Sequence, residues 1–338
     1  MQTGGTVVIV GFGWVGQANA LALSRMGFHV SYFDPGNPSL HYTDTYADAY
    51  GRITRLSGVL ERDAADTAYI VCVGDKVAED GTQDISAIRA ALESLKDAKG
   101  AVVLRSTVIP DLLESLNFDF YMPEFLHEKT AVEECLSPHF FVLGIRDTKT
   151  SRPAFFDAWQ RATPLQFGGT PREAAFVKYL SNLWNATRIA FVNEFGDAIA
   201  EPSTPQDVDS ISRVLNFVLG GEGYTRYGRA FGGHCLPKDT RAFVKWFGEQ
   251  GKNVDLLRGV YASNAAHEAL SVRHPALPEW FSAWQTPHMS GFVAWRELWF
   301  SLYKNISDPR EFLARYWRPF LVLAAAIVVI DAILLLAF

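Results

Sequence analysis

The sequence predicts an α/β protein with a parallel-sheet domain, an all-α central domain and a C-terminal transmembrane helix. Short apolar runs alternate with helical stretches over the first third of the chain. A long helical stretch begins at Pro171, and the residues after Arg318 are almost wholly apolar. The expected domains are residues 1–168, 169–270, 271–318 and 319–338.

Length and composition narrow the class of protein. The 338 residues suit two or three domains, and 49% apolar residues exclude disorder for most of the chain. Acidic residues outnumber basic ones 37 to 31, so the net charge of −6 gives no global attraction to nucleic acid. Cys72, Cys135 and Cys235 have no paired spacing, which argues against a disulfide-stapled secreted protein.

The sheet is predicted from apolar runs without a polar face, which are typical of strands buried on both sides. These runs are Thr6–Val10, His29–Phe33, Ala68–Val73 and Ala101–Thr107, with FDFYM and HFFVLGI as further candidates before about Asp147. Helical stretches at Trp14–Met26 and Ile85–Leu95 separate them. Such alternation predicts a parallel sheet with right-handed crossovers.

A glycine motif follows the first strand and opens the next helix. It consists of Gly11, Phe12, Gly13, Trp14, Val15 and Gly16. Its glycines permit a tight turn and close approach of a pyrophosphate to the helix N-terminus. Asp34, after the second strand, is placed to bind a ribose 2′-hydroxyl and to repel a 2′-phosphate, which favours NAD over NADP. The motif predicts a Rossmann-type NAD-binding domain, with a purely structural glycine turn as the alternative.

The helical domain begins with a long helix at Pro171–Ala200. Its start is marked by Thr170 as N-cap, by a proline at the first position and by Glu173. Its apolar residues cover more than one face, which is typical of a helix buried between domains or subunits, so we expect a homodimer built on it. A glycine-rich loop at residues 220–233 and a helix from about Thr240 to Gln250 follow.

The C-terminal part is rich in tryptophan before it becomes apolar. Residues 271–318 are expected either to lie on a bilayer or to form an aromatic core patch or a docking surface for a membrane partner. Residues Pro319–Phe338, interrupted only by Asp331, are long enough to cross a hydrocarbon core. Basic residues before this span predict a single-pass anchor in membrane lipid with a cytoplasmic catalytic part. A buried helix is the alternative.

A second motif surrounds Cys235. Because it follows Gly232 and Gly233, its thiol is expected to be accessible, and Lys238 is expected to favour the reactive thiolate. By itself, a cysteine in an apolar chain is more often inert. The neighbouring His234 is assigned no role.

The segment from Arg229 to Asp239 resembles the UDP-glucose/GDP-mannose dehydrogenase family, whose hallmark is a cysteine in a Gly-Gly-x-Cys-Leu-Pro-Lys-Asp setting. The resemblance runs from about Val7 to about Asn264 and includes the motifs Ser106–Pro110 and Met122–Glu128. It implies NAD as cofactor and a sugar or nucleotide sugar as substrate. The residues implied at the substrate are Glu124, Phe125, Leu126, Arg229, Gly232, Gly233 and Lys238, and those added at the cofactor are Val73 and Thr107.

The resemblance implies oxidation of a C6 alcohol to the uronic acid by two hydride transfers, with an aldehyde held between them. Cys235 is expected to trap this aldehyde as a thiohemiacetal, which becomes a thioester. Lys178 and Asn182, one helical turn apart, are expected to stabilise the oxyanion. The residues expected in catalysis are Cys235, Lys178 and Asn182, with Asp239 or Glu128 as base and Thr107 orienting the water. Each also has an ordinary structural interpretation.

The chain departs from the family pattern in two places. No second run of buried strands follows residue 270, so the usual nucleotide-sugar-binding domain is expected to be missing. Val73-Gly74-Asp75 stands where the family commonly has Val-Pro-Thr-Pro. Three functions are open: a membrane-anchored sugar oxidoreductase, a non-catalytic NAD-binding subunit of a membrane glycan-synthesis assembly, and another β-hydroxyacid-type dehydrogenase. The accessible cysteine beside an acid favours the first.

Overall fold

Short β-branched and apolar runs build a sheet in the N-terminal half of the chain. The structure, a computed structural model, describes residues 5–127, 129–274, 276–277 and 280–281, all within a unit that ends at Trp284. The strands are β1 (Thr6–Val10), β2 (His29–Phe33), β3 (Thr54–Arg55), β4 (Ala68–Val71), β5 (Lys76–Val77), β6 (Gln83–Asp84), β7 (Ala101–Leu104), β8 (Phe120–Tyr121), β9 (Phe141–Ile145) and β10 (Gln166–Gly169).

The main sheet has the strand order β10-β9-β8-β7-β4-β1-β2-β3, and β5 and β6 form a separate antiparallel hairpin. Neighbouring strands of the main sheet are parallel except β8 and β9, where Phe120 pairs with Ile145 in antiparallel register. The predicted parallel sheet is therefore confirmed, with one antiparallel pair that the sequence did not indicate. An antiparallel strand lets the chain re-enter the sheet without a full crossover, and such strands are common in otherwise parallel sheets.

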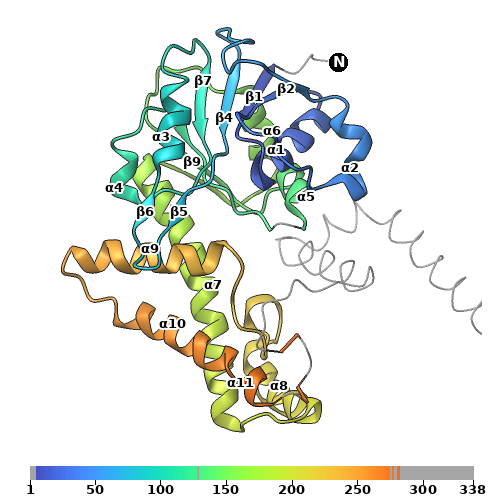
Figure 1. Cartoon of the computed structure of the whole chain (residues 1–338), viewed down its shortest axis with the longest axis vertical. Helices are drawn as coiled ribbons and strands as arrows, with labels where there is room; N and C mark the ends of the chain where they lie inside the picture. The colour runs from blue at the N-terminus through green and yellow to red at the C-terminus, as the bar shows by residue number, and fades with distance from the viewer. Residues whose placement is uncertain (1–4, 128, 275, 278–279, 282–338) are drawn as a thin grey trace, which may run out of the picture. The chain divides into compact units, whose positions relative to one another are not determined.

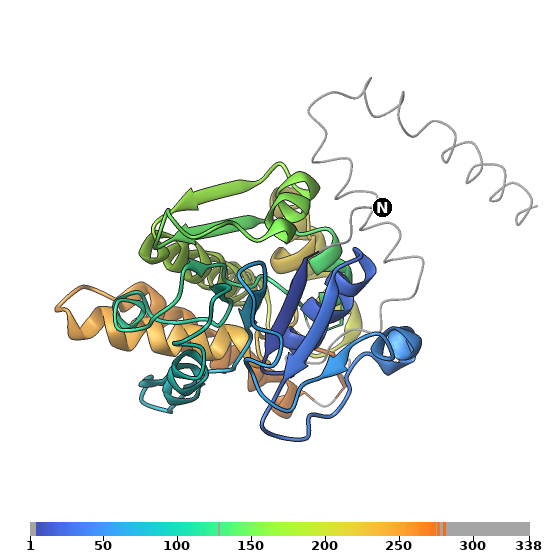
Figure 2. The ribbon, with the colours of Figure 1, turned by 90° about the horizontal axis from the view of Figure 1, so that it is seen from above.

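Helices cover both faces of the sheet, as Figures 1 and 2 show. They are α1 (Trp14–Arg25), α2 (Thr43–Tyr50), α3 (Ser86–Glu93), α4 (Pro110–Leu113), α5 (Ala131–Leu136), α6 (Ala154–Ala162), α7 (Pro171–Ile199), α8 (Pro205–Leu219), α9 (Cys235–Glu249), α10 (Asp255–Glu268) and α11 (Leu270–Arg273), with a 3₁₀ helix, η1, at Gly223–Thr225. Val7 and Ile9 of β1 pack with α1, α5 and α6, while Val8 and Val10 pack with α3 and α4. This alternation is that of a strand buried on both sides, and it confirms the Rossmann-like sheet.

Helix α7 leads from the sheet into the helical part of the chain, where α9 and α10 pack against it (Figure 1). Thr170 and Glu173 form the predicted capping box at its start. Helix α9 begins at Cys235 rather than near Thr240, because Pro237 is compatible with the first turn of a helix. The predicted domain boundary at residues 168 and 169 stays a prediction, although β10 ends at Gly169.

The structure corrects the predicted membrane localisation. Within the described residues, no helix combines the length and the apolar character needed to cross a bilayer. The 29-residue α7 is long enough, but it carries polar side chains such as Lys178 and Asn193 that serve contacts inside the protein. The predicted span at residues 319–338, with Asp331, lies outside the described residues, as does most of the segment 271–318.

Candidate active site

The glycine motif forms a tight turn between β1 and α1. Gly11 has a φ of +88°, and a Cβ on Gly16 would lie 2.0 Å from the carbonyl oxygen of Gly11, so neither position accepts a side chain. A Cβ on Gly13 would meet nothing within 4 Å. Trp14 is exposed, and Val15 packs against the core. The turn therefore leaves open space in front of the amides at the N-terminus of α1.

Asp34 lies beside this turn, directly after β2. Its Oδ2 accepts a hydrogen bond from the backbone amide of Phe12, and its Oδ1 accepts one from the amide of Gly36, both at 2.8 Å. The Phe12 ring is buried and stacks on Tyr32 with 3.7 Å between ring centroids. Phe12 thus contributes its backbone to the turn, and Asp34 presents a fixed carboxylate next to it.

The residues after β4 and β7 lie at the same carboxyl edge of the sheet and carry Val73 and Thr107. A Cβ on Gly11 would lie 2.9 Å from Cγ2 of Val73, so this segment packs directly on the glycine turn. Ser106 donates from its Oγ to the carbonyl of Val73 at 2.6 Å. Thr107 is buried, and its carbonyl accepts from Nε2 of Gln83 at 3.1 Å. Val73 follows β4, which lies next to β1 where the strand order reverses, the usual place for a ligand in such sheets. Thr107 follows the neighbouring strand β7.

Cys235 is the first residue of α9, and its thiol is partly exposed. Burial raises the pKa of this thiol to about 11; the Glu124 carboxylate adds to the rise and the Lys178 ammonium opposes it. The helix N-terminus favours a thiolate, but burial outweighs it. Lys238 lowers the pKa of the thiol, in the direction expected from the sequence, but burial outweighs it, and a pKa of about 11 leaves the thiol protonated near pH 7.

Two buried asparagines hold the loop that leads to Cys235. Asn193 on α7 donates to the carbonyl of Arg229 at 2.8 Å and accepts from the amide of Gly228 at 2.9 Å. Asn264 on α10 accepts from the amide of Phe231 at 2.7 Å and donates to its carbonyl at 2.9 Å. Each side chain therefore satisfies loop backbone groups that would otherwise be buried unpaired.

The same loop carries three predicted substrate residues. Gly233 is exposed with a φ of +68°, a conformation that favours glycine, and Gly232 is half-buried. Arg229 is half-buried as well, and its Nε has no hydrogen-bond partner among the residues that the structure describes. Burial lowers the pKa of Arg229. A buried donor without a partner is available to an incoming ligand.

A buried ion pair joins α7 to the segment after β8. Nζ of Lys178 lies 3.1 Å from Oε1 of Glu124, whose Oε2 accepts from the amide of Leu126 at 2.8 Å. The ammonium also lies 5.2 Å from the centre of the Phe125 ring. Burial disfavours both charges, but their attraction outweighs it, so the pKa of Glu124 is lowered and that of Lys178 is raised. Both groups are charged at neutral pH.

A second ion cluster connects the sheet edge to α9 and α7. Nζ of Lys238 lies 2.9 Å from Oδ1 of Asp75 and 2.6 Å from Oδ1 of Asp239. Oδ2 of Asp239 accepts from Nδ2 of Asn182 at 2.6 Å. Burial opposes the charge of Lys238, but the two carboxylates outweigh it and raise its pKa above the usual value. Lys238, predicted to contact substrate, is thus already bonded inside the protein.

The structure brings most of the predicted catalytic side chains to one place. Lys178 and Asp239 lie close enough to Cys235 for their charges to act on its thiol. Asn182 joins them through Asp239, and Thr107 lies next to the same cluster through Gln83. Glu128 lies outside the described residues. The catalytic roles of these residues stay predictions.

Sequence reasoning missed several side chains that build the site. His127 bridges Glu134, 2.7 Å from its Nδ1, and the hydroxyl of Tyr224, 2.6 Å from its Nε2. The hydrogen bond with Glu134 raises the pKa of His127. Gln83 and Asn264 bond chiefly to backbone groups remote in sequence, and such contacts leave no signature in a single sequence.

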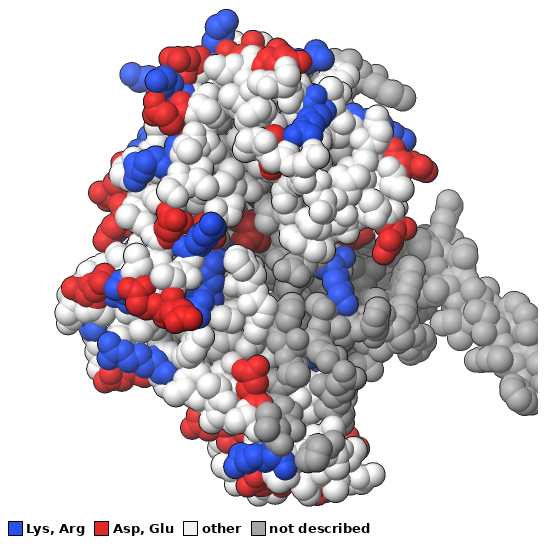
Figure 3. Space-filling view, in the orientation of Figure 1, with Lys and Arg blue, Asp and Glu red and all other residues white. Residues whose placement is uncertain are grey.

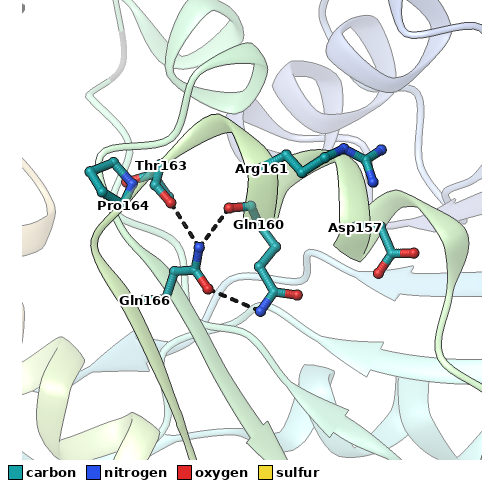
Figure 4. Close-up of a pocket in the computed structure, with 6 residues that line it drawn as sticks. All are labelled: Asp157, Gln160, Arg161, Thr163, Pro164 and Gln166. Carbon is teal, nitrogen blue, oxygen red and sulfur yellow. Dashed lines mark hydrogen bonds between the residues drawn. The ribbon is translucent and has the colours of Figure 1, made fainter. Parts of the chain in front are cut away.

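The surface away from this site shows a polar pocket and mixed charge. The pocket, on α6 and the approach to β10, is lined by Asp157, Gln160, Arg161, Thr163, Pro164 and Gln166 (Figure 4). The amides of its two glutamines bond to each other at 3.0 Å. On the face in Figure 3, acidic and basic side chains are interspersed. Within the described part of the chain, no group of three or more His, Cys, Asp or Glu side chains is arranged to hold a metal ion.

Comparisons with known proteins point to one family. Residues 172–266 match the model of the UDP-glucose/GDP-mannose dehydrogenase family, central domain. The GDP-mannose 6-dehydrogenase of Pseudomonas syringae pv. tomato is 26% identical over 301 residues, covering 77% of this chain and 68% of that protein. The UDP-glucose 6-dehydrogenase of Pseudomonas aeruginosa is 26% identical over 310 residues, covering 78% and 66%. The chain thus spans about two thirds of the length of these relatives.

Solved structures share the fold. A UDP-glucose dehydrogenase from the archaeon Pyrobaculum islandicum superposes with a TM-score of 0.64 at 24% identity, covering 80% of this chain and 70% of its own. A UDP-D-ManNAc dehydrogenase from Pyrococcus horikoshii gives a TM-score of 0.63 at 19% identity, covering 79% and 70%. The family model and the curated relatives together support a relationship of this chain to the UDP-glucose/GDP-mannose dehydrogenase family.

Proposed function

We propose that this chain is an NAD-dependent dehydrogenase that oxidises the C6 alcohol of a nucleotide sugar to the acid. The observation that carries the proposal is that the charges of the Lys178–Glu124 pair and of Asp239, which is bonded to Asn182, act on the thiol of Cys235. A partly exposed thiol among charged groups suits an oxidation that must hold an aldehyde. The curated relatives named above carry this class of activity in their names.

The glycine turn fits NAD. The open space at Gly13 suits a pyrophosphate against the N-terminus of α1, and the Asp34 carboxylate suits a ribose diol. Val73 and Thr107 would lie toward the other end of the cofactor, near the Cys235 cluster. When bound, NAD supplies the hydride acceptor.

Each side chain of the site has its own role in the remaining chemical steps. Sγ of Cys235 bonds to the aldehyde carbon, its proton goes to the former carbonyl oxygen, and the Lys178 ammonium stabilises negative charge on that oxygen during the addition. The resulting thiohemiacetal becomes a thioester when its carbon loses the second hydride to the hydride acceptor and its hydroxyl loses a proton to water. In the hydrolytic step, Asp239 accepts a proton from water whose oxygen attacks the thioester carbon. The carbon–sulfur bond breaks, and the thiol regains its proton. Asn182, bonded to Asp239, keeps a second amide hydrogen for the oxyanion.

The test is a screen for NADH formation with UDP-glucose, GDP-mannose and UDP-N-acetyl sugars. Wild type is expected to produce NADH with at least one of them, while Cys235→Ala is expected to form no acid and to bind NAD as before. Cys135→Ala, which removes a cysteine buried in the sheet core, is the matched control and is expected to retain turnover. Unchanged acid formation by Cys235→Ala would refute the mechanism. NAD binding without turnover on any sugar nucleotide would point to a non-catalytic NAD-binding subunit instead.

A further inference from the structure

The ammonium of Lys238 is saturated by two carboxylates. Its Nζ lies 2.9 Å and 3.0 Å from the two carboxylate oxygens of Asp75 and 2.6 Å from Oδ1 of Asp239. These contacts use all three donors of an ammonium group. All three residues are buried, so solvent screens their interaction little.

Gln83, in the β5–β6 hairpin, fixes the position of the Asp75 side chain. Nε2 of Gln83 donates to Oδ2 of Asp75 at 2.6 Å and to the carbonyl of Thr107 at 3.1 Å. Oε1 of Gln83 accepts from the amide of Ile109 at 2.8 Å. Asp75 therefore has a rigid position at the carboxyl edge of the sheet. It holds Lys238, 163 residues later in the chain, at that edge.

The charges around Cys235 come from several elements. Helix α7 contributes Lys178, the segment after β8 contributes Glu124 with Arg105 acting on it, and α9 contributes Lys238 and Asp239. The hydroxyl of Tyr224 faces the same cluster and contacts the His127–Glu134 pair. Lys178, Lys238 and Arg105 carry three positive charges, which the three carboxylates of Glu124, Asp239 and Asp75 balance. Loss of Asp75 would leave an excess of positive charge, which favours a thiolate.

We propose that Asp75 is a positioning residue that, together with Asp239, binds the Lys238 ammonium and so limits the stabilisation that Lys238 gives to a Cys235 thiolate. Without Asp75, the cluster would lose one negative charge and Lys238 would have two unused donors. Both changes favour the thiolate, the form that reacts with electrophiles and oxidants. The proposal rests on the proposed function for the use of this thiol in turnover, but its test needs no substrate.

The test is the alkylation of Cys235 by iodoacetamide in the full chain, followed by peptide mass spectrometry from neutral to alkaline pH. In this reaction the thiolate sulfur bonds to the methylene carbon, iodide leaves and the proton goes to buffer. Asp75→Asn is expected to speed alkylation by about three- to tenfold near neutral pH and to move the pH midpoint down. Asp75→Glu retains the charge and is expected to react close to the wild-type rate.

Two control variants distinguish an effect of charge on the alkylation rate from an effect of loosened packing. Asp80→Asn removes an exposed carboxylate from the turn between β5 and β6, paired with Lys245 at 3.2 Å, and is expected to leave the rate unchanged. The double variant Asp75→Asn/Lys238→Met removes one charge of each sign and is expected to return the rate toward wild type.

Equal rates for wild type and Asp75→Asn, with thermal melting showing both folded, would overturn the proposal. A double variant as fast as Asp75→Asn would overturn it too, because loosened packing would then explain the reactivity. Failure of the sugar-nucleotide screen would count against the proposed function alone, since the alkylation rate measures the reactivity of the Cys235 thiol without any substrate.

Discussion

At the scale of single residues, the Lys178–Glu124 pair has a structural role inside the protein. Both side chains are buried, and each makes the charge of the other tolerable. Removing one partner of such a pair leaves an uncompensated charge, whereas removing both leaves a polar but neutral site. The pair therefore predicts a distinctive pattern of stability across single and double variants.

Lys178→Met is expected to lower the free energy of unfolding by about 3–5 kcal/mol, because Glu124 is left buried and unpaired. The double variant Lys178→Met/Glu124→Gln is expected to recover a large part of this loss. Urea unfolding followed by circular dichroism measures both. A double variant less stable than the single one would contradict this account of the pair.

The same pair sets a pH dependence whose sign follows from the two pKa shifts. The pKa of Glu124 is lowered in the folded state, so its contribution is present above the unfolded value of about 4.3 and is lost as the pH falls. The pKa of Lys178 is raised, so its contribution is present below the unfolded value of about 10.4 and is lost as the pH rises through the folded one. The double variant is accordingly expected to lose less stability than wild type at both extremes.

The sequence predicted which residues lie together in the site better than it predicted their charge states. Lys178, Asn182, Cys235 and Asp239 lie together, as motif and helical spacing indicated. The charge state of Cys235 could not be read from its neighbours. It depends on burial and on Asp75, which enters the cluster from a different part of the chain.

At the scale of elements, two glycines in the turn between β1 and α1 are required for different reasons. A Cβ on Gly16 collides with the backbone of Gly11, whereas a Cβ on Gly13 meets only open space. Gly16 is therefore needed for the fold itself, and Gly13 is needed only where a ligand approaches closely.

This difference predicts opposite outcomes for two alanine variants. Gly13→Ala is expected to keep the unfolding free energy within about 0.5 kcal/mol of wild type and to weaken NAD binding by about tenfold or more. Gly16→Ala is expected to lose about 1–3 kcal/mol or more of stability. Thermal melting and titration with NAD measure the two effects. A stable Gly16→Ala, or a Gly13→Ala with unchanged affinity, would contradict the assignment.

Elements with strong local signals were predictable, and those made by tertiary contact were not. The capping box at Thr170 marks the start of α7 in the sequence as clearly as in the structure. The hairpin of β5 and β6 has only two residues in each strand, too few for a periodic pattern. The antiparallel pairing of β8 with β9 depends on the path of the chain between them, which hydrophobic patterning does not encode.

At the scale of the whole molecule, one face of α7 exposes large apolar side chains to solvent. The exposed fractions on this face are 71% for Leu180, 56% for Trp184, 57% for Phe191 and 52% for Phe195. Contiguous apolar side chains of this size on a helix are typical of a protein interface. The predicted homodimer through residues 171–200 therefore stays our proposal.

Light scattering after gel filtration is expected to give the mass of a dimer for the wild-type chain. Leu180→Asp/Phe191→Asp is expected to give a monomer with unchanged secondary structure, because a charge on each side of the interface would lose its solvent. Phe217→Asp, at a residue 92% exposed on α8, is the matched control and is expected to remain a dimer. A monomeric wild type, or a dimeric double variant, would refute the interface.

The two buried ion contacts between sheet and helices also have a consequence for biosynthesis. Glu124 and Asp75 leave the ribosome 54 and 163 residues before the lysines that neutralise them. Until α7 and α9 dock, these carboxylates must stay in water or take up protons, since burying them alone is costly. We therefore expect the glycine turn to form early and the carboxyl edge of the sheet to close last. A nascent chain stalled before residue 238 would thus carry a finished glycine turn beside a sheet edge still open to water.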